Sequence, residues 1–185
     1  AKGAYFLFPN VRTIIDIGGQ DAKALKIGDG GMLENFVMND KCAAGTGRFL
    51  DVIARVLEVD VSELQNLDAK STKQVGISST CTVFAESEVI SQLASGTKIE
   101  DIVRGIHDAI ASRVGSLAKR VGLRDDIVFT GGVALNKGMV RALSENTGHK
   151  ILTSPLCQLN GALGAALFGY QKYKLEARKK ARVKA

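Results

Sequence analysis

Three strand patterns stand at the start of the chain, and alternating helix and strand patterns follow them. Apolar and β-branched residues indicate strands over 12–17 and 22–27, and residues 33–38 roughly alternate between apolar and polar. Beyond them, apolar residues recur at helical spacing, with short apolar runs between the helical stretches. Further strands are expected over 74–78, 126–130 and 151–153, and helices over about 49–57, 83–94 and 160–173. A long amphipathic helix should open at residues 97–100 and carry its apolar face as far as Val121, and another helix should start at Asn136. This order predicts an α/β domain with a mixed sheet and helices on both faces.

The same order of elements occurs in the ribonuclease-H-like half-domain of the sugar kinase, Hsp70 and actin (ASKHA) superfamily, and we expect that fold. The domain should cover residues 12–173, after a segment, 1–11, that leads in from a missing N-terminal half-domain. Residues 174–185 are interpreted as a basic C-terminal tail.

Side-chain caps are expected at the start of three helices. Asp60 and Glu63 have the spacing of a capping box for a short helix. Thr97 and Glu100 have the spacing of a capping box, in which Thr97 would cap the long amphipathic helix. Asn136 is well placed to cap the helix that follows it, because its amide oxygen can accept a hydrogen bond from a free backbone N–H.

Composition excludes several classes of protein. An apolar fraction of 45% supports a buried core, and no run reaches the roughly 18 apolar residues of a membrane span. Much of the net charge of +6 comes from the last residues, a pattern that is more typical of a solvated helix end than of a binding face. With few aromatic residues and no tryptophan, we expect neither a nucleic-acid nor a membrane partner.

Two strand patterns end in a pair of glycines. Gly18 and Gly19 follow the first strand, and glycines at such a turn leave room for phosphate oxygens and for N–H groups that point at them. Taken alone, this turn is more simply a tight strand connection. Gly131 and Gly132 repeat the pattern, however, and ligands of open α/β sheets gather beyond the carboxyl ends of strands. The two turns together predict one nucleotide site.

Carboxylates beside the first turn suit a hard cation. Asp16 ends the strand and Asp21 follows the glycines, so either could hold Mg²⁺ or its water molecules.

Two of the three cysteines precede predicted helices. Cys42 and Cys81 would each lie near a helix N-terminus, whose partial positive charge favours a thiolate and the sulfurs of an anionic cluster. Cys157 has no nearby glycine and is interpreted as a buried structural residue. Two thiols cannot fill the usual four positions of an iron–sulfur cluster, so we expect a two-fold dimer in which each copy contributes two ligands. Zinc fits less well, because no Cys-x-x-Cys or histidine pair is present.

These patterns resemble a known family, the ATPase activators of 2-hydroxyacyl-CoA dehydratases, which includes the ATP-coupling subunits of benzoyl-CoA reductase. The likeness extends from Ala1 to about Tyr173 and is most specific around the two cysteines. The motifs that carry it are Asp16-Ile-Gly-Gly-Gln-Asp21, Asn39-Asp-Lys-Cys-Ala-Ala-Gly-Thr-Gly-Arg-Phe49, Ser78-Ser-Thr-Cys-Thr-Val-Phe-Ala-Glu-Ser-Glu88, Thr130-Gly-Gly-Val-Ala-Leu-Asn136 and Asn160-Gly-Ala-Leu-Gly-Ala-Ala166.

The resemblance implies a homodimer that bridges one [4Fe–4S] cluster through Cys42 and Cys81, with ATP and Mg²⁺ in a cleft between two half-domains. ATP hydrolysis would drive one low-potential electron into a dehydratase or benzoyl-CoA reductase component. Ferredoxin or flavodoxin is the expected electron donor, and an anaerobic cytoplasm is the expected location, because a shared surface cluster is oxygen-labile.

Roles for individual residues follow from the resemblance. Gly18, Gly19 and Gln20 would face the β- and γ-phosphates, and Asp16 or Asp21 would face Mg²⁺. Gly131 and Gly132 would border the adenosine, and Asn136 would cap the neighbouring helix. The helix that starts near Cys42 would couple the cluster to the nucleotide.

One departure separates the chain from the family. Members of the family begin with another half-domain that carries a first phosphate loop of the Asp-x-Gly-Ser/Thr type, and nothing in this sequence matches it. Two rival interpretations therefore stay open: a sugar or carboxylate kinase in which the cysteines are incidental, and a half-domain that serves only as a scaffold.

Overall fold

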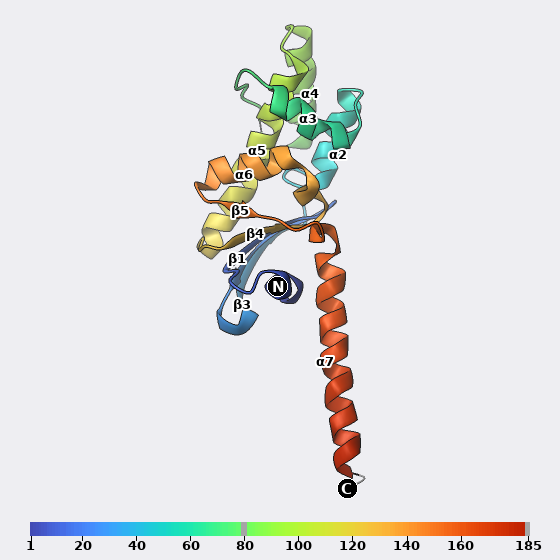
Figure 1. Cartoon of the computed structure of the whole chain (residues 1–185). Coiled ribbons are helices and arrows are strands. Elements are labelled where there is room, and N and C mark those ends of the chain that lie inside the picture. Colours follow the sequence, from blue (N-terminus) through green and yellow to red (C-terminus); the bar gives the residue numbers. More distant parts are fainter. Residues whose placement is uncertain (79–80, 184–185) are drawn as a thin grey trace.

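The computed structural model describes residues 1–78 and 81–183 (Figure 1). Within this part of the chain, five strands form one sheet in the order β3-β2-β1-β4-β5. The first three strands pair antiparallel, whereas β1 pairs parallel with β4 and β4 with β5. The strands are β1 (Thr13–Ile17), β2 (Ala22–Ile27), β3 (Leu33–Asn39), β4 (Ile127–Thr130) and β5 (Ile151–Leu152). The predicted meander and mixed sheet are therefore confirmed.

The strand predicted over 74–78 is wrong. These residues have no strand assignment, and they cross the long helix at Gly105, where any side chain would collide with the carbonyl oxygen of Val75. Ser78 donates its backbone N–H to the Glu88 carboxylate at 2.7 Å. The segment is thus held by helices, and its local apolar pattern reflects contact with a helix surface.

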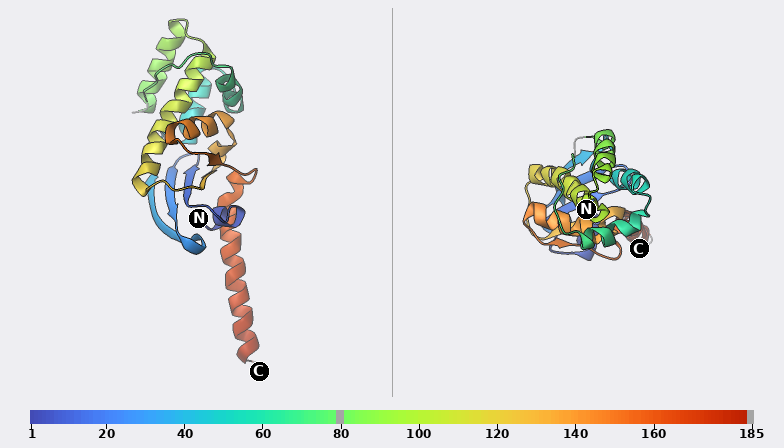
Figure 2. Two further views of the ribbon diagram at one scale, coloured as in Figure 1. Left: turned by 60° about the vertical axis from the view of Figure 1, so that its left-hand side comes forward. Right: turned by 90° about the horizontal axis from the view of Figure 1, so that it is seen from above.

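The larger group of helices covers one face of the sheet and extends beyond the ends of the strands (Figure 2). They surround α5, whose predicted apolar side is buried against β1, β2 and β4 in the larger of two core clusters. The helices of this layer are α2 (Gly47–Val56), α3 (Leu64–Lys70), α4 (Thr82–Ala94), α5 (Ile99–Val121) and α6 (Lys137–Thr147).

The predicted capping box before α5 is wrong. The N-cap of α5 is Lys98, which makes no side-chain cap bond. The hydroxyl of Thr97 instead donates to the Gln92 side chain at 2.8 Å. Packing of the tight turn after α4 therefore outcompetes the local capping signal.

A smaller layer covers the opposite face. Helix α1 (Lys2–Leu7) buries Ala4 in a second core cluster with Val11, Ile14 and Val128. Gly3 of α1 lies so close to Asn160 and Gly164 that a side chain there would collide with the start of α7. The segment expected to lead into the domain is therefore itself a helix packed on the sheet.

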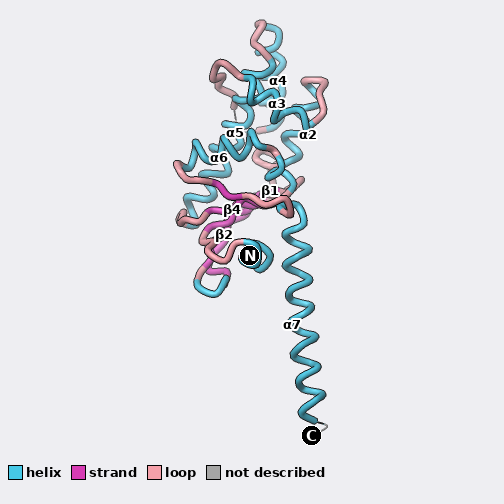
Figure 3. The backbone as a smooth tube through the Cα atoms, in the orientation of Figure 1, coloured by secondary structure: helices cyan, strands magenta, loops and turns pink. Residues whose placement is uncertain are grey.

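Helix α7 (Asn160–Val183) runs past its predicted end near Tyr173. Its first turns lie beside α1, and the rest projects away from the sheet (Figure 3). The basic residues after position 173 thus continue one helix as far as Val183, and Lys184 lies outside the described residues. None of the described helices is long and apolar enough to span a membrane.

Candidate functional site

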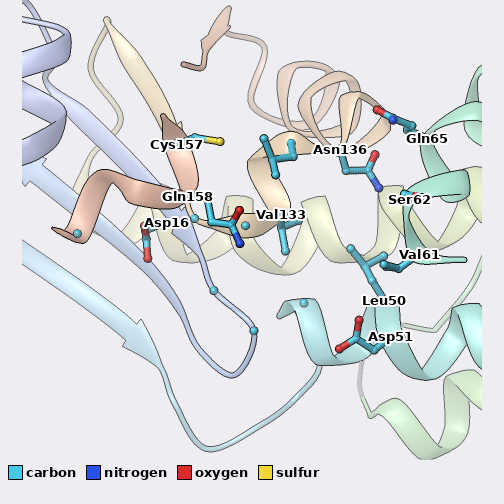
Figure 4. Close-up of a pocket in the computed structure, with 17 residues that line it drawn as sticks. Asp16, Leu50, Asp51, Val61, Ser62, Gln65, Val133, Asn136, Cys157 and Gln158 are labelled. Carbon is cyan, nitrogen blue, oxygen red and sulfur yellow. The ribbon is translucent and has the colours of Figure 1, made fainter. Parts of the chain in front are cut away.

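A cavity of about 690 Å³ opens beyond the carboxyl ends of β1 and β4 (Figure 4). Both glycine turns line it, together with Asp16 and with Gly47 at the start of α2. The far end holds Leu50, Asp51, Val61, Ser62, Gln65 and Asn136, which come from α2, α3, the turn before α3 and the N-cap of α6. The cavity is therefore built where the sheet order reverses around β1, the position at which open α/β sheets bind ligands.

The first glycine turn is tied directly to helix α2. The backbone N–H of Gly18 donates to the carbonyl oxygen of Asp21 at 2.9 Å and closes the turn. The N–H groups of Gly47 and Arg48 donate to the carbonyl oxygens of Gly18 and Gly19 at 2.8 and 2.7 Å, respectively. The first N–H groups of α2 are thus bonded to this turn, and any movement of α2 changes it.

The acidic residues beside the first turn lie in different places. Asp16 lines the cavity and accepts a hydrogen bond from the Thr130 hydroxyl at 2.6 Å, which joins the ends of β1 and β4. Nζ of Lys23 lies 2.6 Å from the Asp21 carboxylate and 3.8 Å from that of Asp16, but Asp21 does not line the cavity. Gln20 is exposed and also lies outside the lining. Asp16 is consequently the carboxylate among these residues that a bound ligand would meet.

The second glycine turn is closely packed on one side only. Gly131 has φ +90° and ψ 171°, a conformation that is essentially restricted to glycine, and a side chain there would collide with the Ile17 backbone. Gly132 meets nothing closer than 3.8 Å and lines the cavity. Cys157 is buried, as expected, but its residue also lines the cavity, and its carbonyl accepts the Gly131 N–H at 3.0 Å.

Asn136 caps α6, as predicted. Its side-chain oxygen accepts from the Met139 N–H at 3.2 Å, while its amide nitrogen lies 3.1 Å from Nε2 of His107. Gln65 on α3 is bonded in a similar way, with its side-chain oxygen accepting from the Lys137 N–H at 3.3 Å. Both amides line the cavity, and both are oriented by the first turn of α6.

A buried charge network lies behind Asn136. The carboxylate of Asp68 contacts Nδ1 of His107 at 2.9 Å and accepts two bonds from Arg141, at 2.8 and 3.0 Å. Burial acts to raise the pKa of Asp68, but hydrogen bonds from His107 and Arg141 outweigh it and hold that pKa well below its usual range. Burial likewise acts to lower the pKa of Arg141, but the Asp68 carboxylate holds it above its ordinary value. Asp68 is therefore ionised at neutral pH.

The two candidate cluster ligands differ in setting. Cys81 is the N-cap of α4, whose first N–H groups follow it directly, as expected. Cys42 lies in a turn five residues before Gly47, so it precedes α2 without standing at its first N–H groups. Both thiols are half-buried, and α2 and α4 are in contact. Ser79 and Thr80 of the second cysteine motif lie outside the described residues.

The chain between α3 and α4 is anchored before it reaches Cys81. The buried carboxylate of Asp101 on α5 accepts from the N–H groups of Thr72 and Lys73 at 2.7 and 2.8 Å. The bond from the Lys73 N–H, followed by that from Thr72, holds the pKa of Asp101 below its usual range. Next to Cys81, α4 exposes three large apolar side chains, Val83, Phe84 and Ile90, each more than half exposed, alongside the exposed Ser87 and Ser91.

The described residues contain no group of three or more histidine, cysteine or acidic side chains that could hold a metal ion. Cys42 and Cys81 are thus at most two thiol ligands from one chain, which fits a cluster only if further ligands come from elsewhere.

Some of the residues that line the cavity were not predicted from the sequence. Gln65 carries no local signal, because it reaches the cavity through the packing of α3 against α6. Ser62 lies in the turn before α3, where the pattern of residues 60–63 indicated a helix start and not a cavity. Asp51 was detectable in principle, since it lies one helical turn after Gly47 on the same side of α2.

The BadF/BadG/BcrA/BcrD ATPase family matches the chain over residues 1–169. The (R)-2-hydroxyglutaryl-CoA dehydratase activating ATPase of Acidaminococcus fermentans is 64% identical over 172 residues, which are 93% of this chain and 66% of that relative. One of the benzoyl-CoA reductase subunits of Thauera aromatica is 35% identical over 184 residues, which cover 96% of this chain and 65% of the relative. The chain thus spans slightly less than two thirds of the length of these relatives.

Solved structures agree with the sequence relatives. The activator of the 2-hydroxyisocaproyl-CoA dehydratase from Clostridium difficile, with bound ADPNP, matches with a TM-score of 0.93 and 56% identity, over 96% of this chain and 66% of that one. MreB 5 of Spiroplasma citri, an actin-like protein, matches at 15% identity with a TM-score of 0.55, over 97% of this chain and 60% of that one. The predicted ribonuclease-H-like ASKHA fold is thereby confirmed.

Proposed function

The chain belongs to the BadF/BadG/BcrA/BcrD ATPase family, and from this membership we propose that it is part of an ATP-hydrolysing activator. The activator would transfer one low-potential electron from an iron–sulfur cluster to a 2-hydroxyacyl-CoA dehydratase. The observation that carries the proposal is the cavity lined by both glycine turns, in a chain whose relatives include named dehydratase activators.

The nucleotide would lie along this cavity. Gly18 and Gly19 would face the β- and γ-phosphates, since both line the cavity and Gly19 has open space around it. Asp16 is the carboxylate best placed to meet Mg²⁺ or its water molecules. Gln20 and Asp21 would act in the phosphate region only after a rearrangement, because neither lines the cavity. Gly131, Gly132 and Asn136 would border the adenosine. The ADPNP bound to the Clostridium difficile relative supports nucleotide binding by this fold.

The two half-buried thiols support a shared cluster. Cys42 and Cys81 would hold it, with the same two residues of a second copy, which makes the active form a homodimer. When bound, such a cluster supplies one electron at low potential. The exposed apolar side chains of α4 beside Cys81 are consistent with burial against another protein surface.

Coupling between the two sites would run through α2. Its N–H groups at Gly47 and Arg48 are bonded to the carbonyls of the phosphate turn, while the residues just before it carry Cys42. A nucleotide that moves the Gly18–Gly19 turn would therefore displace α2 directly. Ferredoxin or flavodoxin would supply the electron, and an oxygen-labile shared cluster points to an anaerobic cytoplasm.

Iron content after anaerobic purification tests the proposal. We expect about four iron and four sulfide ions per dimer of the complete protein. Cys42→Ser and Cys81→Ser should each lose the cluster and its visible absorbance. Cys157→Ser is the matched control, and it should keep the iron because that residue lines the nucleotide cavity. Stoichiometric iron retained in Cys42→Ser would reject the ligand assignment.

A second candidate is an ATP-coupling subunit of the benzoyl-CoA reductase type, which the match to the Thauera aromatica protein favours. Electron transfer from the purified protein to each type of acceptor component separates the two candidates. A kinase of the same superfamily would instead yield a phosphorylated product and contain no iron.

A further inference from the structure

A histidine–aspartate pair is enclosed directly behind the nucleotide cavity. His107 on α5 is fully buried, and Asp68 on α3 is only 3% exposed. The two are joined at 2.9 Å, between Nδ1 of His107 and a carboxylate oxygen of Asp68. Helix α6 closes over them at Gly138, where an added side chain would lie 2.6 Å from Nδ1 of His107. The pair is therefore built into the contact of three helices.

The two hydrogen bonds of His107 determine its protonation pattern. The ionised Asp68 carboxylate can only accept, so Nδ1 of His107 carries the hydrogen. On the other side of the ring, Nε2 faces the Asn136 amide nitrogen at 3.1 Å, and an amide nitrogen can only donate. Nε2 must then be the acceptor. His107 is thus a neutral imidazole with its hydrogen on Nδ1.

This arrangement leaves one orientation for the Asn136 amide. Its oxygen accepts from the Met139 N–H, and one hydrogen of its nitrogen goes to His107. The second hydrogen is left for the cavity that Asn136 lines. The Gln65 amide is arranged in the same way, because its oxygen accepts the Lys137 N–H and its nitrogen keeps its hydrogens. The amides at this end of the cavity consequently offer N–H donors.

We propose that Asp68 and His107 are positioning residues that fix Asn136 as a hydrogen-bond donor to an acceptor atom of the bound nucleoside. Leu50, Val61 and Val133 give this end of the cavity apolar walls suited to a planar base, whose edge carries such acceptors (Figure 4). The inference rests on the proposed nucleotide-binding function and adds the element that orients the nucleoside.

The protonation pattern can be measured on the unaltered protein. Long-range ¹H–¹⁵N correlation spectra of the full chain should show His107 with a protonated Nδ1 and an unprotonated Nε2. A hydrogen on Nε2 in the wild-type protein would overturn the proposal, because Asn136 would then have no acceptor at that nitrogen.

Substitutions test whether the pair acts through Asn136. Binding of MgADP to the complete protein is measured by calorimetry. His107→Leu should raise the dissociation constant about tenfold. His107→Gln should restore it to within about twofold, since its amide can donate to Asp68 and accept from Asn136. His149→Leu is the matched control, because that histidine is partly exposed and pairs with Asp125; it should bind as the wild type does.

A double-mutant cycle separates positioning from a general loss of structure. Asn136→Ser keeps a capping oxygen for α6 but removes the amide donor. In that background, His107→Leu should add less than about twofold to the dissociation constant. Full additivity, or wild-type affinity in His107→Leu, would overturn the inference while leaving the proposed function standing. Absence of any MgADP binding by the wild-type protein would overturn both.

Discussion

The two glycine turns occupy equivalent places in the sheet, yet they use glycine for different reasons. At the second turn, Gly131 has a backbone conformation that only glycine adopts and touches the Ile17 backbone. At the first turn, neither glycine has a positive φ, and Gly19 meets nothing within 4 Å. The second turn thus needs a glycine to fold, whereas the first leaves open space that a ligand can fill.

The charges behind the turns differ in the same way. The second turn leads to Asn136 and the buried network of Asp68, His107 and Arg141. The first leads to the Lys23–Asp21 ion pair, in which both side chains are about one third exposed. The Asn136 end of the cavity is therefore held in place by a buried charge network. The first glycine turn is instead attached to helix α2 through backbone hydrogen bonds.

The largest expected effect is that of Gly131→Ala. The alanine must adopt a glycine-only conformation against a packed backbone, so the free energy of unfolding should fall by at least about 3 kcal/mol. Urea denaturation monitored by circular dichroism measures the change. Gly148→Ala is the control, because Gly148 has a left-handed conformation (φ +72°, ψ 15°) with open space around it and should lose only about 1–2 kcal/mol. If both variants lost the same free energy of unfolding, the close packing of Gly131 against Ile17 would not add to the cost of its backbone conformation.

The next effect concerns the buried network. Asp68→Asn removes the carboxylate that His107 and Arg141 share, while Arg141 keeps its contacts with Asp108 and Glu145. We expect urea denaturation at neutral pH to show a loss of about 2 kcal/mol. Asp21→Asn should cost about 0.5 kcal/mol or less, since that pair is exposed to solvent.

The Asp68→Asn substitution should also change how the free energy of unfolding depends on pH. The folded-state pKa of Asp68 lies below its unfolded value of about 3.9, so its stabilisation is fully present above that pH. It is lost as the pH falls towards the folded-state value. Unfolding free energies measured below about pH 4 should therefore decrease more steeply for the wild type than for Asp68→Asn. Parallel curves would show that Asp68 does not contribute.

The smallest effect on stability is expected at Gly19, which has open space around it. Gly19→Ala should change the unfolding free energy by no more than about 0.5 kcal/mol. If the turn binds phosphates as proposed, the added methyl group takes space needed by their oxygens, so the dissociation constant of MgADP should rise at least about tenfold. Gly169→Ala in the projecting part of α7 serves as control and should bind normally. Unchanged binding by Gly19→Ala would contradict the assignment of the first turn to the phosphates.

Local sequence patterns predicted correctly those elements whose conformation is not overridden by contacts with distant segments. Alternation and apolar runs identified β1 and β2, because half-buried and fully buried strands leave these patterns. The rough alternation of β3 also identified a strand, although most of its residues are exposed. Asn136 was predicted as a cap because its bond to Met139 lies within one helical turn. The same reasoning was wrong at Thr97 and at 74–78, where contacts with Gln92 and with α5 decide the conformation.

The amino-acid sequence alone determined most of the order of strands and helices, the two glycine pairs and the two cysteines that precede helices. Periodicity and glycine content act locally, so they can be read along the chain. Only the tertiary structure decided that Asp16 and not Asp21 lines the cavity, and that Gly131 is restricted while Gly19 is open. It also assembled Asp68, His107 and Asn136 from three helices, because packing of distant segments sets which side chains meet.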